Sequence, residues 1–168
     1  MQCIRCGTTA ADGSRFCAKC GGQLSDPGAA TARISAAGTA VDPLPVRSAV
    51  GDEPVDLAAL GEEAVLVFWN PGCGHCRAME PALRAWAADP PAGAARLVLV
   101  SSGAASEGLE SLTVLDPQFA AGRYFGATGT PMAVRVDAEG RVASGLATGG
   151  DAALALARSG FALKLVTR

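Results

Sequence analysis

Residues Val65–Cys76 read VLVFWNPGCGHC. The first five, Val65–Trp69, are β-branched or aromatic apart from one leucine, which is typical of a buried strand. The Asn-Pro-Gly segment that follows is a turn signal, because proline and glycine both interrupt regular structure. Directly after it come Cys73 and Cys76, spaced as Cys-Gly-His-Cys. The stretch therefore predicts a pair of cysteines where a strand gives way to a helix.

A helix is predicted from about Cys73 to Ala88. Its apolar residues Met79, Leu83 and Trp86 recur at helical spacing. Pro81 lies within it and predicts a kink, because proline lacks the amide hydrogen and crowds the preceding turn.

The rest of the chain continues an α/β pattern. The predicted strands are, in chain order, Val65–Trp69, Arg96–Ser101, Met132–Val136 and Arg141–Leu146. The predicted helices are Cys73–Ala88, Pro117–Tyr124 and Asp151–Arg158. Asp116 is expected to be the N-cap of the second helix, with Pro117 at its first position. The last two strands are expected to form a hairpin through residues 137–140, and this order of elements predicts a mixed sheet.

Composition narrows the class of protein. The chain has 168 residues, of which 49% are hydrophobic, and a formal net charge of −2. Because there is no basic run, we expect no nucleic-acid partner and no binding to an anionic membrane surface. The longest apolar runs are too short to span a bilayer, and no secretory signal is evident at the N-terminus. Together with cysteines that occur only in Cys-x-x-Cys pairs, this predicts a cytoplasmic protein.

Four of the six cysteines form two pairs near the N-terminus, Cys3/Cys6 and Cys17/Cys20. Two such turns supply four sulfurs, which suits the tetrahedral coordination of one structural zinc ion. Iron in a rubredoxin-like site and two structural disulfides are the alternatives. The segment resembles the short zinc ribbons at the start of many bacterial proteins, with Phe16 as the single aromatic residue of its small core. We expect a structural unit and not a nucleic-acid-binding one.

Three regions follow from these patterns. Residues 1–24 form the predicted zinc ribbon, which is too short to fold on a hydrophobic core alone. Residues 25–41 are rich in alanine, glycine, serine and threonine without periodicity, and are predicted to be a flexible linker. Residues 42–168 carry the α/β pattern and form the main domain.

The third cysteine pair is predicted to be redox-active. The free amides and the dipole at a helix N-terminus stabilise a thiolate, so Cys73 is expected to be acidic and nucleophilic. Cys76 lies one turn later, within reach of a disulfide with Cys73. An imidazolium at His75, the only histidine in the sequence, would further favour the Cys73 thiolate and make the disulfide more oxidising.

At these residues the chain resembles the thioredoxin-like superfamily and, within it, the TlpA-like thiol–disulfide oxidoreductases. The resemblance covers residues 42–158. Trp69 lies where the family has its active-site tryptophan, Pro81 matches its kink proline, and Thr130-Pro131 looks like its cis-proline site, where the residue before the proline pairs with an extended substrate. The resemblance implies a thioredoxin-like fold, with a central mixed sheet flanked by helices. It also implies catalytic cysteines at 73 and 76, with the supporting residues Trp69, His75, Thr130 and Pro131.

The sequence departs from this family at the carboxylate that would accept the Cys76 proton. Thioredoxins bury an aspartate in the strand before the motif, where this chain has Val67. TlpA-like proteins often place a glutamate where this chain has Met79, and Glu80 comes one residue later. We expect Glu80 to be a solvated residue on the helix surface, which leaves the rate and direction of exchange open.

These observations predict an enzyme, a thiol–disulfide oxidoreductase that exchanges its Cys73–Cys76 pair with protein or small-molecule disulfides. Its expected partners are disulfide-containing proteins and a thiol reductant, and no organic cofactor is expected. A different class of function stays open: a non-catalytic module, recruited through the ribbon, that senses oxidation or passes on a soft metal such as Cu(I) through Cys73, His75 and Cys76. A peroxiredoxin-like peroxidase is less favoured, because the sequence has no Thr-x-x-Cys pattern.

Overall fold

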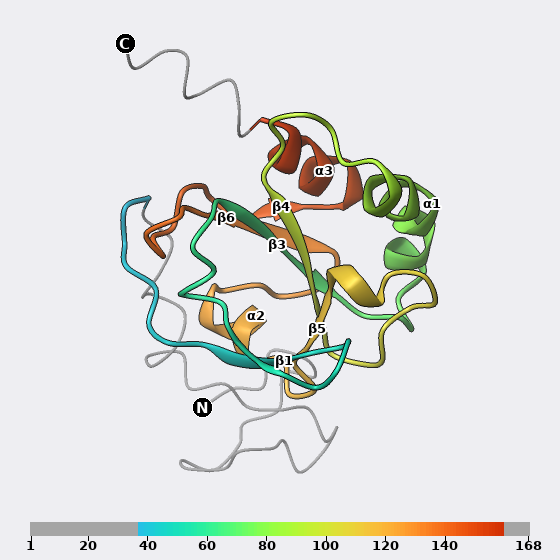
Figure 1. Ribbon diagram of the computed structural model, residues 1–168, viewed down its shortest axis with the longest axis horizontal. Coiled ribbons are helices and arrows are strands. Elements are labelled where there is room, and N and C mark those ends of the chain that lie inside the picture. Colours follow the sequence, from blue (N-terminus) through green and yellow to red (C-terminus); the bar gives the residue numbers. More distant parts are fainter. Residues whose placement is uncertain (1–36, 160–168) are drawn as a thin grey trace, which may run out of the picture. The chain divides into compact units, whose positions relative to one another are not determined.

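The computed structural model describes residues 37–159. The predicted zinc ribbon, with Cys3, Cys6, Cys17 and Cys20, lies outside this range, as does most of the predicted linker. Within the described range, a seven-stranded sheet runs through the fold and carries helices on both of its faces (Figure 1).

The sheet is mixed, as predicted. Its strands are β1 Pro45–Ser48, β2 Pro54–Asp56, β3 Ala64–Trp69, β4 Arg96–Ser101, β5 Thr113–Leu115, β6 Met132–Val136 and β7 Ala147–Thr148. Their order across the sheet is β2-β1-β5-β4-β3-β6-β7. Strands β3, β4 and β5 are parallel, whereas the other neighbouring pairs are antiparallel.

The helices lie on both sides of this sheet. They are α1 Gly74–Ala88, the short 3-10 helix η1 Glu110–Leu112, α2 Ala120–Tyr124 and α3 Gly150–Arg158. Helices α1 and α3 pack into one hydrophobic core, and α2 packs into the other. No helix between residues 37 and 159 is both long and apolar enough to cross a membrane.

Strand β3 lies inside the sheet, between β4 and β6, and all six of its residues are buried. Alternate side chains of a strand point to opposite faces. Leu66 and Phe68 therefore enter the core on the α2 side, whereas Val67 and Trp69 enter the core shared with α1 and α3. The predicted buried strand at Val65–Trp69 is confirmed.

Helix α1 follows β3 after a short turn and begins at Gly74, with Cys73 as its N-cap residue. Its buried residues are Cys76, Met79, Leu83 and Trp86. The predicted helix and its apolar face are thus confirmed. Pro81 lies inside α1 on its exposed side, and the helix continues past it.

Helix α2 begins later than predicted, at Ala120 instead of Pro117. A turn comes first, in which the N–H of Phe119 donates to the carbonyl oxygen of Asp116 at 2.9 Å. The buried Asp116 carboxylate then accepts hydrogen bonds from the N–H groups of Ala120 and Ala121, at 3.0 and 2.9 Å. Asp116 therefore caps the helix, but from further upstream than its sequence position suggested, because the turn lies between them.

The predicted hairpin is confirmed at its turn, but its second strand is not continuous. The Asp137 N–H donates to the Arg141 carbonyl oxygen at 2.9 Å, and Val142 forms an isolated antiparallel bridge with Val136. The Ser144 side-chain oxygen accepts a hydrogen bond from the Arg135 N–H at 2.9 Å, in place of a continued ladder. The chain therefore bulges between Val142 and Ala147, where β7 begins its regular pairing with β6.

The last residues of the predicted linker contact the domain. The N–H of Gly38 donates to the carbonyl oxygen of Val142 at 2.7 Å, and the N–H of Val41 donates to that of Gly140 at 2.8 Å. The side chain of Val41 is buried in the core on the α2 side. The contacts of the domain therefore extend upstream of Asp42.

Candidate active site

The Asn-Pro-Gly turn holds Cys73 at the start of α1. The side-chain oxygen of Asn70 accepts a hydrogen bond from the Gly72 N–H at 2.8 Å, and the Asn70 carbonyl accepts one from the Cys73 N–H at 3.0 Å. Cys73 keeps an extended backbone, with φ −83° and ψ 124°, and helical geometry begins at the next residue. The Cys73 side chain therefore lies beside the free N–H groups of the first helical turn.

These N–H groups lower the pKa of the Cys73 thiol below its ordinary value. The largest cause is the backbone N–H of Cys76, which hydrogen-bonds to the sulfur, and the backbone N–H of His75 acts in the same direction. Burial opposes them by raising the pKa but does not reverse the shift. Because hydrogen bonds to the charged form stabilise it, the Cys73 thiolate persists at a lower pH than an ordinary thiolate.

Cys76 has the opposite properties. Its side chain is fully buried in the core beneath α1. Burial disfavours the charged form and raises the pKa of the Cys76 thiol. Since the thiolate and not the thiol attacks disulfides, this asymmetry supports Cys73 as the nucleophile and Cys76 as the residue that reacts second.

A segment far away in the sequence completes the site. The carbonyl oxygen of Thr130 accepts a hydrogen bond from the Cys73 thiol, with 3.4 Å between oxygen and sulfur. The hydroxyl group of Thr130 contributes to the lowered pKa of Cys73. The Thr130–Pro131 peptide bond is cis, and Pro131 is buried. The structure thus brings Thr130 of the predicted Thr-Pro pair into contact with Cys73.

The other two predicted supporting residues have different surroundings. Trp69 is fully buried in the same core as Cys76, and its indole Nε1 has no hydrogen-bond partner among the described residues. His75 is exposed, and its ring makes no hydrogen bond or ion pair within residues 37–159. The effect of His75 on Cys73 comes from its backbone N–H, and a role for its imidazole stays a prediction.

In the described part of the chain, no hydrogen bond or ion pair joins Cys76 to a carboxylate. Val67 is fully buried in the same core, so this face of β3 offers an aliphatic side chain there. The Glu80 carboxylate is partly buried and accepts a hydrogen bond from Arg84 at 3.1 Å, one turn along α1. The i, i+4 spacing of these two residues is a sequence signal for their pairing. Among the described residues, no carboxylate is therefore in hydrogen-bond contact with Cys76.

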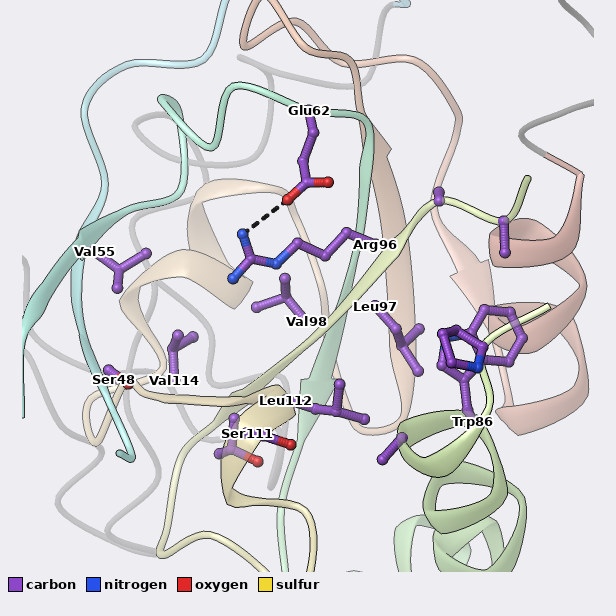
Figure 2. Close-up of a pocket in the computed structure, with 15 residues that line it drawn as sticks. Ser48, Val55, Glu62, Trp86, Arg96, Leu97, Val98, Ser111, Leu112 and Val114 are labelled. Atoms are coloured by element: carbon purple, nitrogen blue, oxygen red, sulfur yellow. Dashed lines mark hydrogen bonds and ion pairs between the residues drawn. The ribbon is translucent and has the colours of Figure 1, made fainter. Parts of the chain in front are cut away.

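A cavity of about 310 Å³ lies away from the cysteines (Figure 2). Trp86 and Leu97, which belong to the core beneath α1, line this cavity together with Val98 of the other core. Its lining also includes an ion pair between Arg96 and Glu62, at 3.0 Å. Trp86 belongs to the last turn of α1, whereas Cys73 precedes its first turn. This cavity therefore lies at the opposite end of α1 from Cys73.

The described residues contain no assembled site for the soft metal ion of the alternative function. Within residues 37–159, no group of three or more histidine, cysteine, aspartate or glutamate side chains is arranged to hold a metal ion. Cys73, His75 and Cys76 are therefore not brought together as ligands, although they lie within one helical turn.

The lowered pKa of Cys73 predicts its alkylation behaviour. In the reduced Cys76→Ser variant, modification of Cys73 by iodoacetamide is expected to rise with pH and to reach half its plateau below about pH 8.5, the value of an ordinary thiol. The sign follows because a lowered pKa shifts the formation of the thiolate to lower pH. Peptide mass spectrometry separates Cys73 from the N-terminal cysteines. A midpoint at or above pH 8.5 would contradict a lowered pKa of the Cys73 thiol.

No protein-family model matches this chain, and no curated protein is similar to it in sequence. Several solved structures are similar to it. A thiol:disulfide interchange protein from a Bacteroides species is 19% identical, with a TM-score of 0.55, and the match covers 72% of this chain and 88% of that one. A thio-disulfide isomerase from Thermus thermophilus is 23% identical, with a TM-score of 0.53, and the match covers 79% of this chain and 97% of that one.

A third similar structure is the exposed lipoprotein thioredoxin Etrx1 from Streptococcus pneumoniae. It is 20% identical, with a TM-score of 0.52, and the match covers 68% of this chain and 96% of the other. At these identities the similarity concerns the fold. The chain therefore has a thioredoxin-like fold, with a mixed sheet and helices on both faces, as the sequence predicts.

Proposed function

We propose that this protein is a thiol–disulfide oxidoreductase that works through Cys73 and Cys76. One observation carries the proposal: the Cys73 thiol, at the start of α1, contacts the Thr130 carbonyl oxygen and lies one helical turn from the buried Cys76. The pKa values of the two thiols are shifted in opposite directions, which supports separate roles. The similar structures are described as thiol–disulfide interchange or isomerase proteins and as a thioredoxin, which supports the same class of reaction.

The reaction proceeds in two exchanges. The Cys73 thiolate attacks one sulfur of a substrate disulfide, the substrate S–S bond breaks, and the leaving thiolate takes up a proton. Cys76 then loses its proton and attacks the Cys73 sulfur, which releases the second substrate thiol. Two electrons pass to the substrate, and Cys73 and Cys76 are left as a disulfide. A thiol reductant reverses this oxidation and restores the enzyme.

Disulfide-containing proteins are the proposed substrates. Cys73 is only partly buried, and the Thr130 backbone lies beside its sulfur. Thr130 occupies the position that, in the family the sequence resembles, pairs with an extended substrate, so a bound polypeptide would place its disulfide against the Cys73 sulfur. The buried Cys76 then reacts only with the mixed disulfide formed at Cys73.

We propose a cytoplasmic location on the basis of the sequence. Four N-terminal cysteines that hold a metal must stay reduced, which suits a reducing compartment. The similar structure from Streptococcus pneumoniae is an exposed lipoprotein, so the same fold also occurs outside that compartment. Fractionation of the native cells with antibodies against the chain tests this, and recovery in a secreted or membrane fraction contradicts it.

The N-terminal segment is proposed to hold one structural zinc ion through Cys3, Cys6, Cys17 and Cys20. The purified, reduced chain is expected to contain about one zinc ion, because four thiolates complete a tetrahedral site. Elemental analysis of Cys3→Ser and Cys17→Ser is expected to show loss of this ion, with Cys73→Ser as the control that retains it. Iron in place of zinc, or zinc lost from the Cys73→Ser protein, would overturn the assignment.

The test of the proposed function is the capture of substrates by Cys76→Ser. This variant keeps the nucleophile but cannot resolve the mixed disulfide, so partners stay bound to Cys73 until dithiothreitol releases them. Mass spectrometry of the released proteins identifies the substrates. The double variant Cys73→Ser/Cys76→Ser is the matched control and is expected to capture none of them. Equal capture by both variants would refute the proposal.

A further inference from the structure

A groove of about 270 Å³ runs between α1 and the start of α3. On the α1 side it is lined by His75, Ala78, Met79 and Ala82. On the α3 side it is lined by Gly149, Gly150, Asp151 and Leu154. His75 belongs to the first turn of α1, and Cys73 is the N-cap residue of the same helix, so the groove begins at the end of α1 that carries Cys73.

A hydrogen bond joins the groove to the exchange site. The Gly149 N–H donates to the carbonyl oxygen of Pro131 at 3.0 Å, and Pro131 follows Thr130, which contacts Cys73. Gly149 has a φ of 95°, in the left-handed region that favours glycine. This conformation brings the start of α3 against Pro131. The α3 side of the groove is thus hydrogen-bonded to the residue that follows Thr130.

The floor of the groove is apolar. Met79 and Leu154 are 6% and 8% exposed, and the small side chains of Ala78 and Ala82 are exposed above them. A Cβ atom at Gly150 would lie 2.6 Å from Cγ of Met79, so glycine at this position lets Met79 pack directly against the α3 backbone. The groove is thus closed at its base and open toward solvent, which suits an apolar side chain from a partner.

Among the described residues that line the groove, Asp151 alone carries a carboxylate. Its side chain is exposed and makes no hydrogen bond or ion pair within residues 37–159. An acidic residue in the first turn of a helix also stabilises that helix, and this effect alone could account for an aspartate there. Because Asp151 lies at the rim of the groove, its carboxylate can also form an ion pair with a basic side chain of a bound polypeptide.

We propose that this groove selects the substrate. It takes an apolar side chain that flanks the attacked cysteine, while Asp151 pairs with a lysine or arginine of the same polypeptide. The inference rests on the proposed function and names its substrate class: cysteine-containing polypeptides with apolar and basic residues beside the disulfide. Apolar contact supplies affinity, and the pairing at the rim supplies discrimination between charges.

The experiment uses four synthetic peptides whose single cysteine is linked by a disulfide to 2-nitro-5-thiobenzoate. They differ only at two flanking positions, with leucine or alanine at one and lysine or glutamate at the other. Release of the coloured thiolate by the reduced full chain gives the rate constant. The leucine–lysine peptide is expected to react about fivefold faster than its alanine counterpart, since burial of apolar carbons favours it. It is expected to react about threefold faster than its glutamate counterpart, as for an exposed ion pair.

Variants at the surface separate the two contributions. Asp151→Lys is expected to reverse the lysine–glutamate preference while the leucine preference remains. Ala78→Leu, which fills the groove from an exposed helical position, is expected to remove the leucine preference. Glu139→Lys is the matched control for charge and is expected to change neither preference. Pro131 comes just before β6, whereas Glu139 follows the other end of this strand.

A neutral small disulfide, bis(2-hydroxyethyl) disulfide, distinguishes failure of the inference from failure of the proposed function. If the chain reduces this reagent but treats the four peptides alike, the groove does not select substrates and the exchange activity stands. If the chain reduces neither the reagent nor any peptide, the proposed function itself fails. If Glu139→Lys shifts the charge preference as much as Asp151→Lys does, general electrostatics replaces the groove as the cause.

Discussion

Replacing Cys73 with serine is expected to reduce dithiothreitol-dependent reduction of insulin to the rate without enzyme. The serine hydroxyl cannot take over the role of the thiolate, and Cys76 cannot replace it, because Cys76 is fully buried and burial raises the pKa of its thiol. We expect a loss of at least about a thousandfold in kcat/KM, as for the removal of other essential nucleophiles. The turbidity of precipitating insulin chains gives the measurement.

The comparison with Cys76→Ser makes this result specific. That variant keeps Cys73 and its hydrogen bond to Thr130, so it is expected to react once with a disulfide and then to stop as a mixed disulfide. Mass spectrometry of the intact protein detects the added thiol. Full turnover by Cys73→Ser would show that exchange takes place elsewhere in the chain, with the N-terminal cysteines as the first candidates.

Replacing Phe68 with alanine is expected to lower the free energy of unfolding by about 3–5 kcal/mol. Phe68 is fully buried on the inner strand β3, and its ring lies 6.0 Å from that of Phe119 and 5.9 Å from that of Phe125. The alanine would leave a cavity that β3, held between β4 and β6, cannot close. Urea denaturation followed by circular dichroism measures the change.

An exposed residue provides the control for this loss. Val50 is 57% exposed, so Val50→Ala is expected to change the free energy of unfolding by no more than about 0.5 kcal/mol. If Phe68→Ala were as stable as Val50→Ala, the core on the α2 side would not contribute as the structure implies. The two variants together test the packing of β3 without affecting the cysteines.

The sequence predicts the elements that are long or fully buried. Strands β3, β4 and β6 and helices α1 and α3 have clear patterns of apolar residues, and the structure confirms them. Strands β1, β2, β5 and β7 are short, between two and four residues, and too brief for periodicity to appear. The start of α2 was missed because Asp116 caps it across a turn, an arrangement that a local capping signal does not distinguish.

The candidate site, too, could be predicted from the sequence only in part. The position of Cys73 before a helix follows from the strand and turn that precede it, and the resemblance to a known family adds Thr130 and Pro131. The sequence predicts Asp151 only as the beginning of a helix, because its proximity to His75 depends on how α3 packs against α1. The stabilisation of Cys73 by free N–H groups is predicted from its position before a helix, and the structure confirms its direction, with the N–H of Cys76 as the largest cause. The effect of the His75 ring stays a prediction.

The two edge strands of the sheet affect how readily the protein aggregates with other polypeptides. An exposed strand offers unpaired N–H and C=O groups on which other polypeptides can aggregate. Here the sheet ends in β2, of three residues with Pro54 at its start, and in β7, of two residues followed by Gly149. Edges this short, one of which lacks an N–H at its first residue, give a neighbouring chain little to extend. The edges of the described sheet therefore offer little template for aggregation to any polypeptide that comes close to Cys73.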